Sequence, residues 1–116
     1  MKLVIGNKNY SSWSLRAWFL LKETGFDFEE HRIPLDTDTT AGVIARFSPA
    51  GQVPVLLIDD EIIWDTVAIG ETVAERWPEK QLWPADPASR SHARAISAEM
   101  HSGFLALREA MPMNCR

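Results

Sequence analysis

The chain has 116 residues, of which 46% are hydrophobic and 24% charged, a composition typical of one globular domain with a buried core. Its formal net charge of −4 excludes the basic field that drives nucleic-acid binding, and no apolar run approaches the roughly 20 residues that span a bilayer. The single cysteine, Cys115, excludes an internal disulfide and favours a reducing, cytoplasmic location.

The first half of the chain predicts two strand–helix pairs. Residues 2–6 form a short apolar run that predicts a buried strand, and a Ser-rich turn follows. Apolar residues then recur at helical spacing until Gly25, a typical C-terminal stop. Residues 26–33 predict a second strand, and a short helix is expected before Pro49.

The next block predicts a hairpin and a third helix. Residues 53–58 and 61–64 read as strands joined by a two-aspartate turn. Asp65-Thr66 then opens a helix that Pro78 ends.

The C-terminal part differs in character. Three prolines lie within residues 77–87, and a long helical pattern runs from Asp86-Pro87 to about Met111. We therefore expect a domain over 1–80, a linker over 81–87 and the first helix of a second, helical domain over 88–116. That helix is amphipathic with no partner helix in the sequence, so we expect the chain to be a piece of a longer protein.

The predicted order, βαβαββα with a proline at the start of the third strand, resembles the α/β thioredoxin-like fold. Four segments narrow the resemblance: SSWSLR at 11–16, GFDFE at 25–29, SPAGQVPVL at 48–56 and DTVAI at 65–69. Together they resemble the N-terminal domain of the cytosolic glutathione S-transferases, followed by the start of their all-helical domain. The serine motif is most similar to the serine-type zeta class, which includes maleylacetoacetate isomerases, although Trp13 stands where the zeta motif has a cysteine.

The resemblance makes Ser11 the catalytic serine, with Ser12 as the second choice if the register slips by one residue. A hydroxyl at a helix N-terminus stabilises a thiolate, because a hydrogen bond and the helix dipole both favour the charged form. The alternative is that these serines are simply helix caps.

The resemblance also implies a site for the rest of glutathione. A cis Val53–Pro54 bond would present the Val53 backbone to the cysteinyl residue, and the side chain of Gln52 would bind the peptide. The alternatives are an ordinary trans proline at a strand start and a surface glutamine. Asp65 and Thr66 would bind the γ-glutamyl ammonium and carboxylate, and either residue is also a typical N-cap.

Several other residues are weaker candidates. Arg46 could reach the glycyl carboxylate, although a solvated arginine is the simpler interpretation. The three histidines, His31, His92 and His101, show no metal-ligand spacing, so we expect no metal site. In the family, the helix that carries Met100 and His101 lines the pocket for the electrophile, but the spacing does not tell which face points there.

The resemblance implies a glutathione S-transferase that uses glutathione as co-substrate against a small electrophile. It also implies a homodimer and a role in detoxification. Two alternatives stay open: a glutathione-dependent cis–trans isomerase of the maleylacetoacetate type, and a non-catalytic dimerisation module with the same fold.

Overall fold

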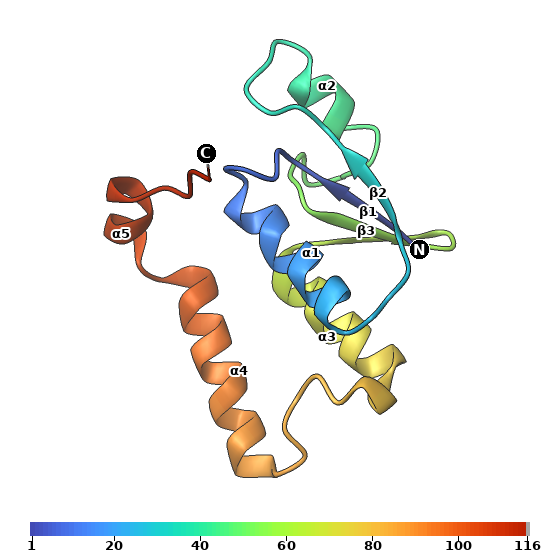
Figure 1. The fold of residues 1–116 in the computed structure, drawn as a ribbon, viewed down its shortest axis with the longest axis vertical. Helices are drawn as coiled ribbons and strands as arrows, with labels where there is room; N and C mark the ends of the chain where they lie inside the picture. Colours follow the sequence, from blue (N-terminus) through green and yellow to red (C-terminus); the bar gives the residue numbers. More distant parts are fainter. Residues whose placement is uncertain (116) are drawn as a thin grey trace.

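A computed structural model describes residues 1–115 of the chain. In chain order the elements are β1 (Lys2–Ile5), α1 (Ser12–Glu23), β2 (Glu29–Arg32), α2 (Thr40–Ile44), β3 (Val55–Ile58), β4 (Glu61–Trp64), α3 (Thr66–Arg76), a 3-10 turn (Pro78–Lys80), α4 (Pro87–Ser102) and α5 (Leu105–Ala110). The first seven elements reproduce the predicted βαβαββα order, which confirms the thioredoxin-like fold class (Figure 1).

The four strands form one mixed sheet in the order β2-β1-β3-β4. β1 runs parallel to β2 and antiparallel to β3, and β3 and β4 form the predicted hairpin. The crossover through α1 allows β1 and β2 to be parallel, whereas the tight turn at Asp59-Asp60 forces the last two strands to be antiparallel. Two strands begin later than predicted, β2 at Glu29 instead of residue 26 and β3 at Val55 instead of residue 53.

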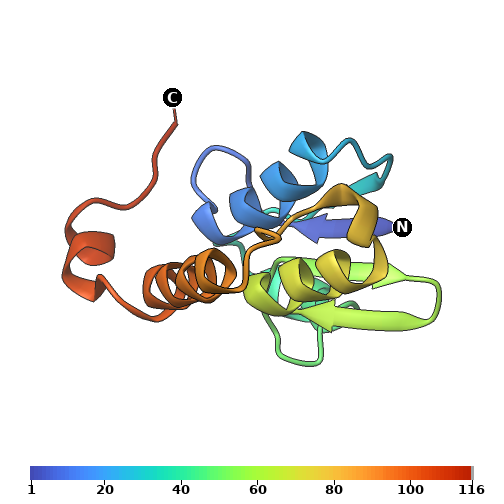
Figure 2. The same cartoon turned by 90° about the horizontal axis from the view of Figure 1, so that it is seen from below.

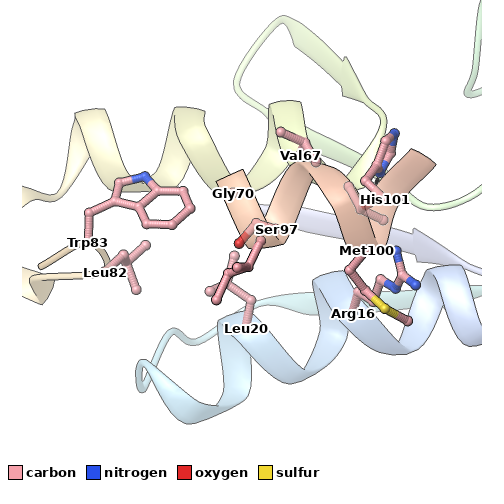
Figure 3. A pocket seen from close by; sticks show the side chains of 11 residues that line it. Arg16, Leu20, Val67, Gly70, Leu82, Trp83, Ser97, Met100 and His101 are labelled. Carbon is pink, nitrogen blue, oxygen red and sulfur yellow. Dashed lines mark hydrogen bonds between the residues drawn. The ribbon is translucent and has the colours of Figure 1, made fainter. Parts of the chain in front are cut away.

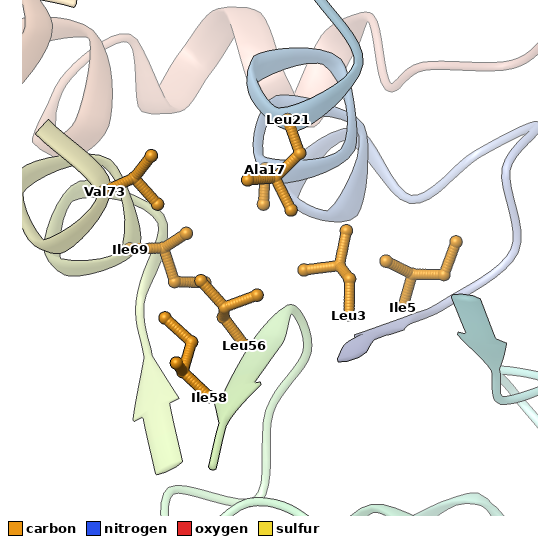
Figure 4. Close-up of a cluster of buried hydrophobic side chains, with 8 residues drawn as sticks. All are labelled: Leu3, Ile5, Ala17, Leu21, Leu56, Ile58, Ile69 and Val73. Carbon is orange, nitrogen blue, oxygen red and sulfur yellow. The ribbon is translucent and has the colours of Figure 1, made fainter. Parts of the chain in front are cut away.

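The sheet separates two apolar clusters, because successive strand residues point to opposite faces. Leu3 and Ile5 point toward α1 and α3, and this face holds the larger cluster, drawn in Figure 4. Val4 points to the other face and packs with Ile33, Ile44 of α2 and Val55. Apolar side chains thus cover β1 on both faces, and the loop after β1 carries the serine turn.

The C-terminal segment corrects one expectation. The pattern predicts a single helix from residue 87 to about residue 111, but the structure has two helices separated at Gly103 and Phe104. Phe104 adopts a left-handed conformation with φ 62°, and the side chain of Arg108 donates to the Gly103 carbonyl at 2.9 Å. The turn therefore satisfies carbonyls that a continuous helix would have bonded itself.

Helices α4 and α5 lie to one side of the sheet domain, with α4 beside α3 (Figures 1 and 2). None of the residues of α4 or α5 is buried. Among the described residues, no helix is both long and apolar enough to cross a membrane.

Candidate functional site

The serine turn lies between β1 and α1 and is held by a short hydrogen-bond chain. Ser11 occupies the N-cap position of α1, yet its hydroxyl caps no backbone amide. Instead it donates to Ser14 Oγ at 2.8 Å, and Ser14 Oγ accepts the Gly6 N–H at 2.9 Å. The hydroxyls are nearly enclosed, with Ser11 9% and Ser14 2% exposed. The helix-cap interpretation of Ser11 therefore does not describe its hydrogen bonding.

Gly6 packs closely beneath this serine. A Cβ at this position would lie 2.4 Å from Leu35 Cδ1 and 3.1 Å from Ser11 Oγ. A larger residue would therefore have to push the Leu35 side chain aside and would crowd the Ser11 hydroxyl.

A cleft of about 480 Å³ opens above the serine turn. We call it the serine cleft. Its lining residues come from the start of α1, the segment between β2 and the end of α2, the loop before β3, the start of α3, and α4. They are Ser11, Trp13, Leu35, Ile44, Gln52, Val53, Pro54, Asp65, Thr66 and His101. The fold thus brings together, in one cleft, all five residues that the sequence predicted to bind glutathione, although they lie far apart in the chain. Ser12 is the first residue of α1 and is not among the lining residues.

The loop before β3 contributes one wall of the serine cleft. The Val53–Pro54 peptide bond is cis, and Pro54 is buried beneath it. The preceding residue, Gln52, is exposed, and its backbone N–H donates to Ser48 Oγ at 3.3 Å. The glutamine side chain therefore stays available at the edge of the cleft.

The start of α3 forms the opposite wall. Asp65 is the N-cap, and its Oδ1 accepts from the N–H groups of Val67 at 2.8 Å and Ala68 at 3.4 Å. Its backbone has φ 75° and ψ 134°, a conformation that is strained for a non-glycine residue and typical of functional sites. The cap uses Oδ1, and the other carboxylate oxygen, Oδ2, contacts a side chain of α4.

His101 meets this wall from α4, and its position was not predictable from the helical spacing. Its Nε2 lies 3.1 Å from Asp65 Oδ2, and its Nδ1 lies 3.3 Å from Thr66 Oγ1. The imidazole also packs edge-on against Trp13, with ring centroids 5.2 Å apart. His101 is therefore the functional candidate that sequence reasoning left undecided, and the side-chain contacts supply the missing orientation.

The other weak candidates lie elsewhere. Arg46 is exposed and does not line the serine cleft, and His92 is exposed on α4. His31 packs against the Phe47 ring at a centroid distance of 4.7 Å. These positions agree with the simpler surface and packing interpretations.

A second hollow of about 590 Å³ continues from the serine cleft between α1, α3 and α4 (Figure 3). We call it the apolar groove; it is lined by Arg16, Leu20, Thr66, Val67, Gly70, Leu82, Trp83, Ile96, Ser97, Met100 and His101. Thr66 and His101 line both hollows, so the two are adjoining. A polar ligand in the serine cleft would thus have an apolar space beside it.

Comparison with known proteins gives a consistent result. A family model described as glutathione S-transferase, N-terminal domain, matches residues 10–76. The probable maleylacetoacetate isomerase of Caenorhabditis elegans is 34% identical over 93 residues, covering 80% of this chain and 42% of that protein. Glutathione S-transferase GstA of Escherichia coli O157:H7 is 33% identical over 102 residues, covering 81% of this chain and 51% of that protein. The chain spans about half the length of these relatives.

Solved structures extend the likeness to the whole fold. A glutathione transferase homologue from Burkholderia, determined with bound glutathione, matches with a TM-score of 0.78 and 30% identity, covering 94% of this chain and 58% of that one. A bacterial zeta-class maleyl pyruvate isomerase matches with a TM-score of 0.78 and 25% identity, covering 93% of this chain and 50% of that one.

Proposed function

Because this chain belongs to the glutathione S-transferase family, we propose that it is the glutathione-binding part of a serine-type glutathione transferase. Residues 1–80 would bind glutathione, 81–87 would link the domains, and 88–116 would begin the helical domain. The observation that supports this proposal is that one cleft is lined by Ser11, Gln52, Val53, Asp65 and Thr66.

Ser11 is the group that would stabilise the glutathione thiolate. A free thiol is mostly protonated near neutral pH, so lowering its pKa raises the concentration of the nucleophile. The Ser11 hydroxyl stands at the N-terminus of the 12-residue helix α1, where the dipole favours negative charge. A hydroxyl that donates to the sulfur adds a charge-assisted hydrogen bond.

The wall at the start of α3 suits the γ-glutamyl end of glutathione, which carries both an ammonium and a carboxylate. The ammonium would pair with Asp65 Oδ2 in place of the His101 imidazole, which now lies 3.1 Å from it. Thr66, whose hydroxyl His101 would release as well, would bind the carboxylate together with the helix N-terminus. Across the cleft, the Val53 backbone and the Gln52 side chain would hold the peptide part of the ligand.

The bound thiolate would attack an electrophilic carbon of a second, more apolar substrate in the adjoining groove. The sulfur–carbon bond forms as the leaving group departs. We further propose that the protein acts as a cytoplasmic homodimer, as the family resemblance implies.

A second candidate is a glutathione-dependent cis–trans isomerase, which the likeness to maleylacetoacetate isomerases favours. In that reaction the thiolate adds to the double bond and leaves again, so no conjugate accumulates. Product analysis with an aryl halide and with a maleyl compound separates the two activities.

The testing experiment compares Ser11→Ala with the unchanged protein. Turnover should fall about 10- to 100-fold, since the lost hydrogen bond acts mainly on the ionised sulfur. Glutathione should still raise the melting temperature of the variant, because binding to the folded state stabilises it by mass action. Ser12→Ala is the matched control and should keep its activity.

Three outcomes would contradict parts of this proposal. Equal activity of Ser11→Ala and the unchanged protein would remove the role of Ser11. A loss confined to Ser12→Ala would show that the register is shifted by one residue. A complete lack of thermal stabilisation by glutathione would favour the non-catalytic module.

A further inference from the structure

Two arginines meet at one tryptophan beside the serine cleft. The guanidinium carbon of Arg16, on α1, lies 4.3 Å from the centroid of the Trp13 ring. That of Arg108, on α5, lies 4.7 Å from the same ring. All three side chains are half-buried. Like charges held this close repel each other, so the arrangement calls for a compensating negative charge.

A second arginine–tryptophan pair in the chain shows what such compensation looks like. Arg94 lies 5.4 Å from the Trp83 ring and also pairs with Glu71, with nitrogen–oxygen distances of 3.0 and 3.2 Å. These hydrogen bonds raise the pKa of Arg94. Its charge is thus neutralised within the protein.

Arg16 has no such partner in the part of the chain that the structure describes. No carboxylate lies within 4.0 Å of its guanidinium, which also makes no hydrogen bond there. Partial burial, together with the charge of Arg108, lowers the pKa of Arg16. The guanidinium of Arg16 is therefore half-buried, and its donors have no acceptor within residues 1–115.

Arg108 differs from Arg16 because its donors are already engaged. Its Nε donates to the Gly103 carbonyl at 2.9 Å, and a terminal nitrogen donates to the Met100 carbonyl. It is therefore fixed at the end of α4, where it adds positive potential near Trp13. Arg16 is the arginine that stays available for a ligand.

The position of Arg16 connects this charge to the proposed reaction. Among residues 1–115 it is the one arginine or lysine that lines the apolar groove. Figure 3 shows its side chain beside Met100, at the end of the groove where His101 lies. His101 also lines the serine cleft. A ligand seated in the groove would thus meet one cation close to the proposed sulfur site.

We propose that Arg16 is a specificity-determining residue that binds a carboxylate on the electrophilic substrate, whose apolar body lies in the groove. The planar guanidinium matches a carboxylate in a bidentate geometry. This inference rests on the proposed function, and it adds the substrate class: an apolar electrophile with an acidic group.

The test uses the complete protein and two electrophiles with the same reacting ring, 4-chloro-3,5-dinitrobenzoate and its uncharged methyl ester. In both, the glutathione sulfur bonds to the ring carbon as chloride leaves, and the thiol proton goes to solvent. Arg16→Met should lower kcat/KM for the benzoate about 10- to 100-fold, because a charged hydrogen-bonded pair is lost. It should change kcat/KM for the ester, and KM for glutathione, less than about twofold. Arg16→Lys should restore part of the preference for the acid.

Arg94→Met is the matched control, since it also removes an arginine stacked on a tryptophan. It should leave the ratio of benzoate to ester turnover unchanged. With the unchanged protein, added salt should raise KM for the benzoate but not for the ester, because salt screens the ion pair. The salt dependence tests for an ion pair with the benzoate in the unchanged protein, so it remains informative even if Arg16→Met folds poorly.

An equal loss for both electrophiles in Arg16→Met, or a salt response shared by both, would overturn the role of Arg16 while leaving the transferase proposal intact. A lack of reaction with either electrophile, together with no thermal stabilisation by glutathione, would instead overturn the proposed function and this inference with it.

Discussion

The hydroxyl of Ser11 is held by another hydroxyl rather than by the helix it precedes. Ser14 Oγ already accepts the Gly6 N–H, so its own proton can be donated to Ser11. If Ser11 turns its proton toward a sulfur, Ser14 can donate to the vacated lone pair. The chain of donors would then run from Gly6 through both serines to the thiolate, and each bond would strengthen the next. Ser14 is thus a positioning residue in the proposed reaction.

At this scale we predict that Ser14→Ala lowers both stability and turnover. The Gly6 N–H would lose its buried acceptor, which costs about 1–3 kcal/mol of the free energy of unfolding. The rate rises with pH as the glutathione thiol loses its proton, so a less favoured thiolate should also shift this ascending limb of the rate profile to higher pH. Urea unfolding and the pH dependence of kcat/KM measure the two effects. A loss of stability with an unchanged pH profile would mean that Ser14 serves only the fold.

Among the elements, the break between α4 and α5 decides where His101 and Arg108 lie. Gly103 is extended, and its N–H donates to the Glu99 carbonyl at 2.7 Å. A Cβ on Gly103 would lie 2.7 Å from that same carbonyl oxygen, so a side chain there must displace backbone. His101 lies two residues before this turn and Arg108 lies just beyond it. The conformation of Gly103 therefore affects the position of His101, which lines both the serine cleft and the apolar groove.

We therefore predict that Gly103→Ala loosens the turn without unfolding the sheet domain. Hydrogen exchange of the amides in residues 96–111 should become about fivefold faster, equivalent to about 1 kcal/mol of local stability. Gly42→Ala is the control, because a Cβ at Gly42 meets nothing within 4 Å. That variant should leave exchange in 96–111 unchanged and raise the free energy of unfolding by about 0.4–1 kcal/mol. Unchanged exchange in Gly103→Ala would show that the turn tolerates a side chain.

Taken as a whole, the molecule concentrates its core at one end. Every buried hydrophobic residue in the described chain lies between Leu3 and Val73. Helices α4 and α5 instead expose large apolar side chains, among them Ile96, Met100, Phe104, Leu105, Leu107 and Met111. The two helices therefore add little to the stability of the sheet domain, and they carry an apolar face that favours association.

We predict that a shortened chain ending at Asp86 still folds. Its free energy of unfolding in urea should stay within about 1 kcal/mol of that of the 116-residue chain, since no buried side chain is removed. It should also stay monomeric at concentrations where the longer chain associates, which sedimentation would measure. A shortened chain without a cooperative transition would show that α4 stabilises the sheet domain despite its exposed surface.

Much of the sheet domain was predictable from the sequence because its signals are local. Hydrophobic periodicity, the two-aspartate turn and the stops at Gly25 and Pro78 each depend on neighbouring residues, and they predicted the seven elements in order. The resemblance carried by four short segments then named five of the ten residues that line the serine cleft. The predicted first residues of β2 and β3 were wrong by two or three positions, because hydrogen bonding to a neighbouring strand decides where a strand begins.

Tertiary structure alone decided which side chains from distant parts of the chain meet. Arg16 and Arg108 come from opposite ends of the chain, and His101 reaches Asp65 only because α4 packs beside α3. The spacing of the apolar residues predicted that α4 has an apolar face, but it did not predict which part of the sheet domain that face contacts. Such contacts depend on the path of the whole backbone, whereas periodicity reports only the local conformation. The sequence by itself therefore determined the fold class and the candidate residues, and the packing of α4 and α5 determined the charge and shape beside them.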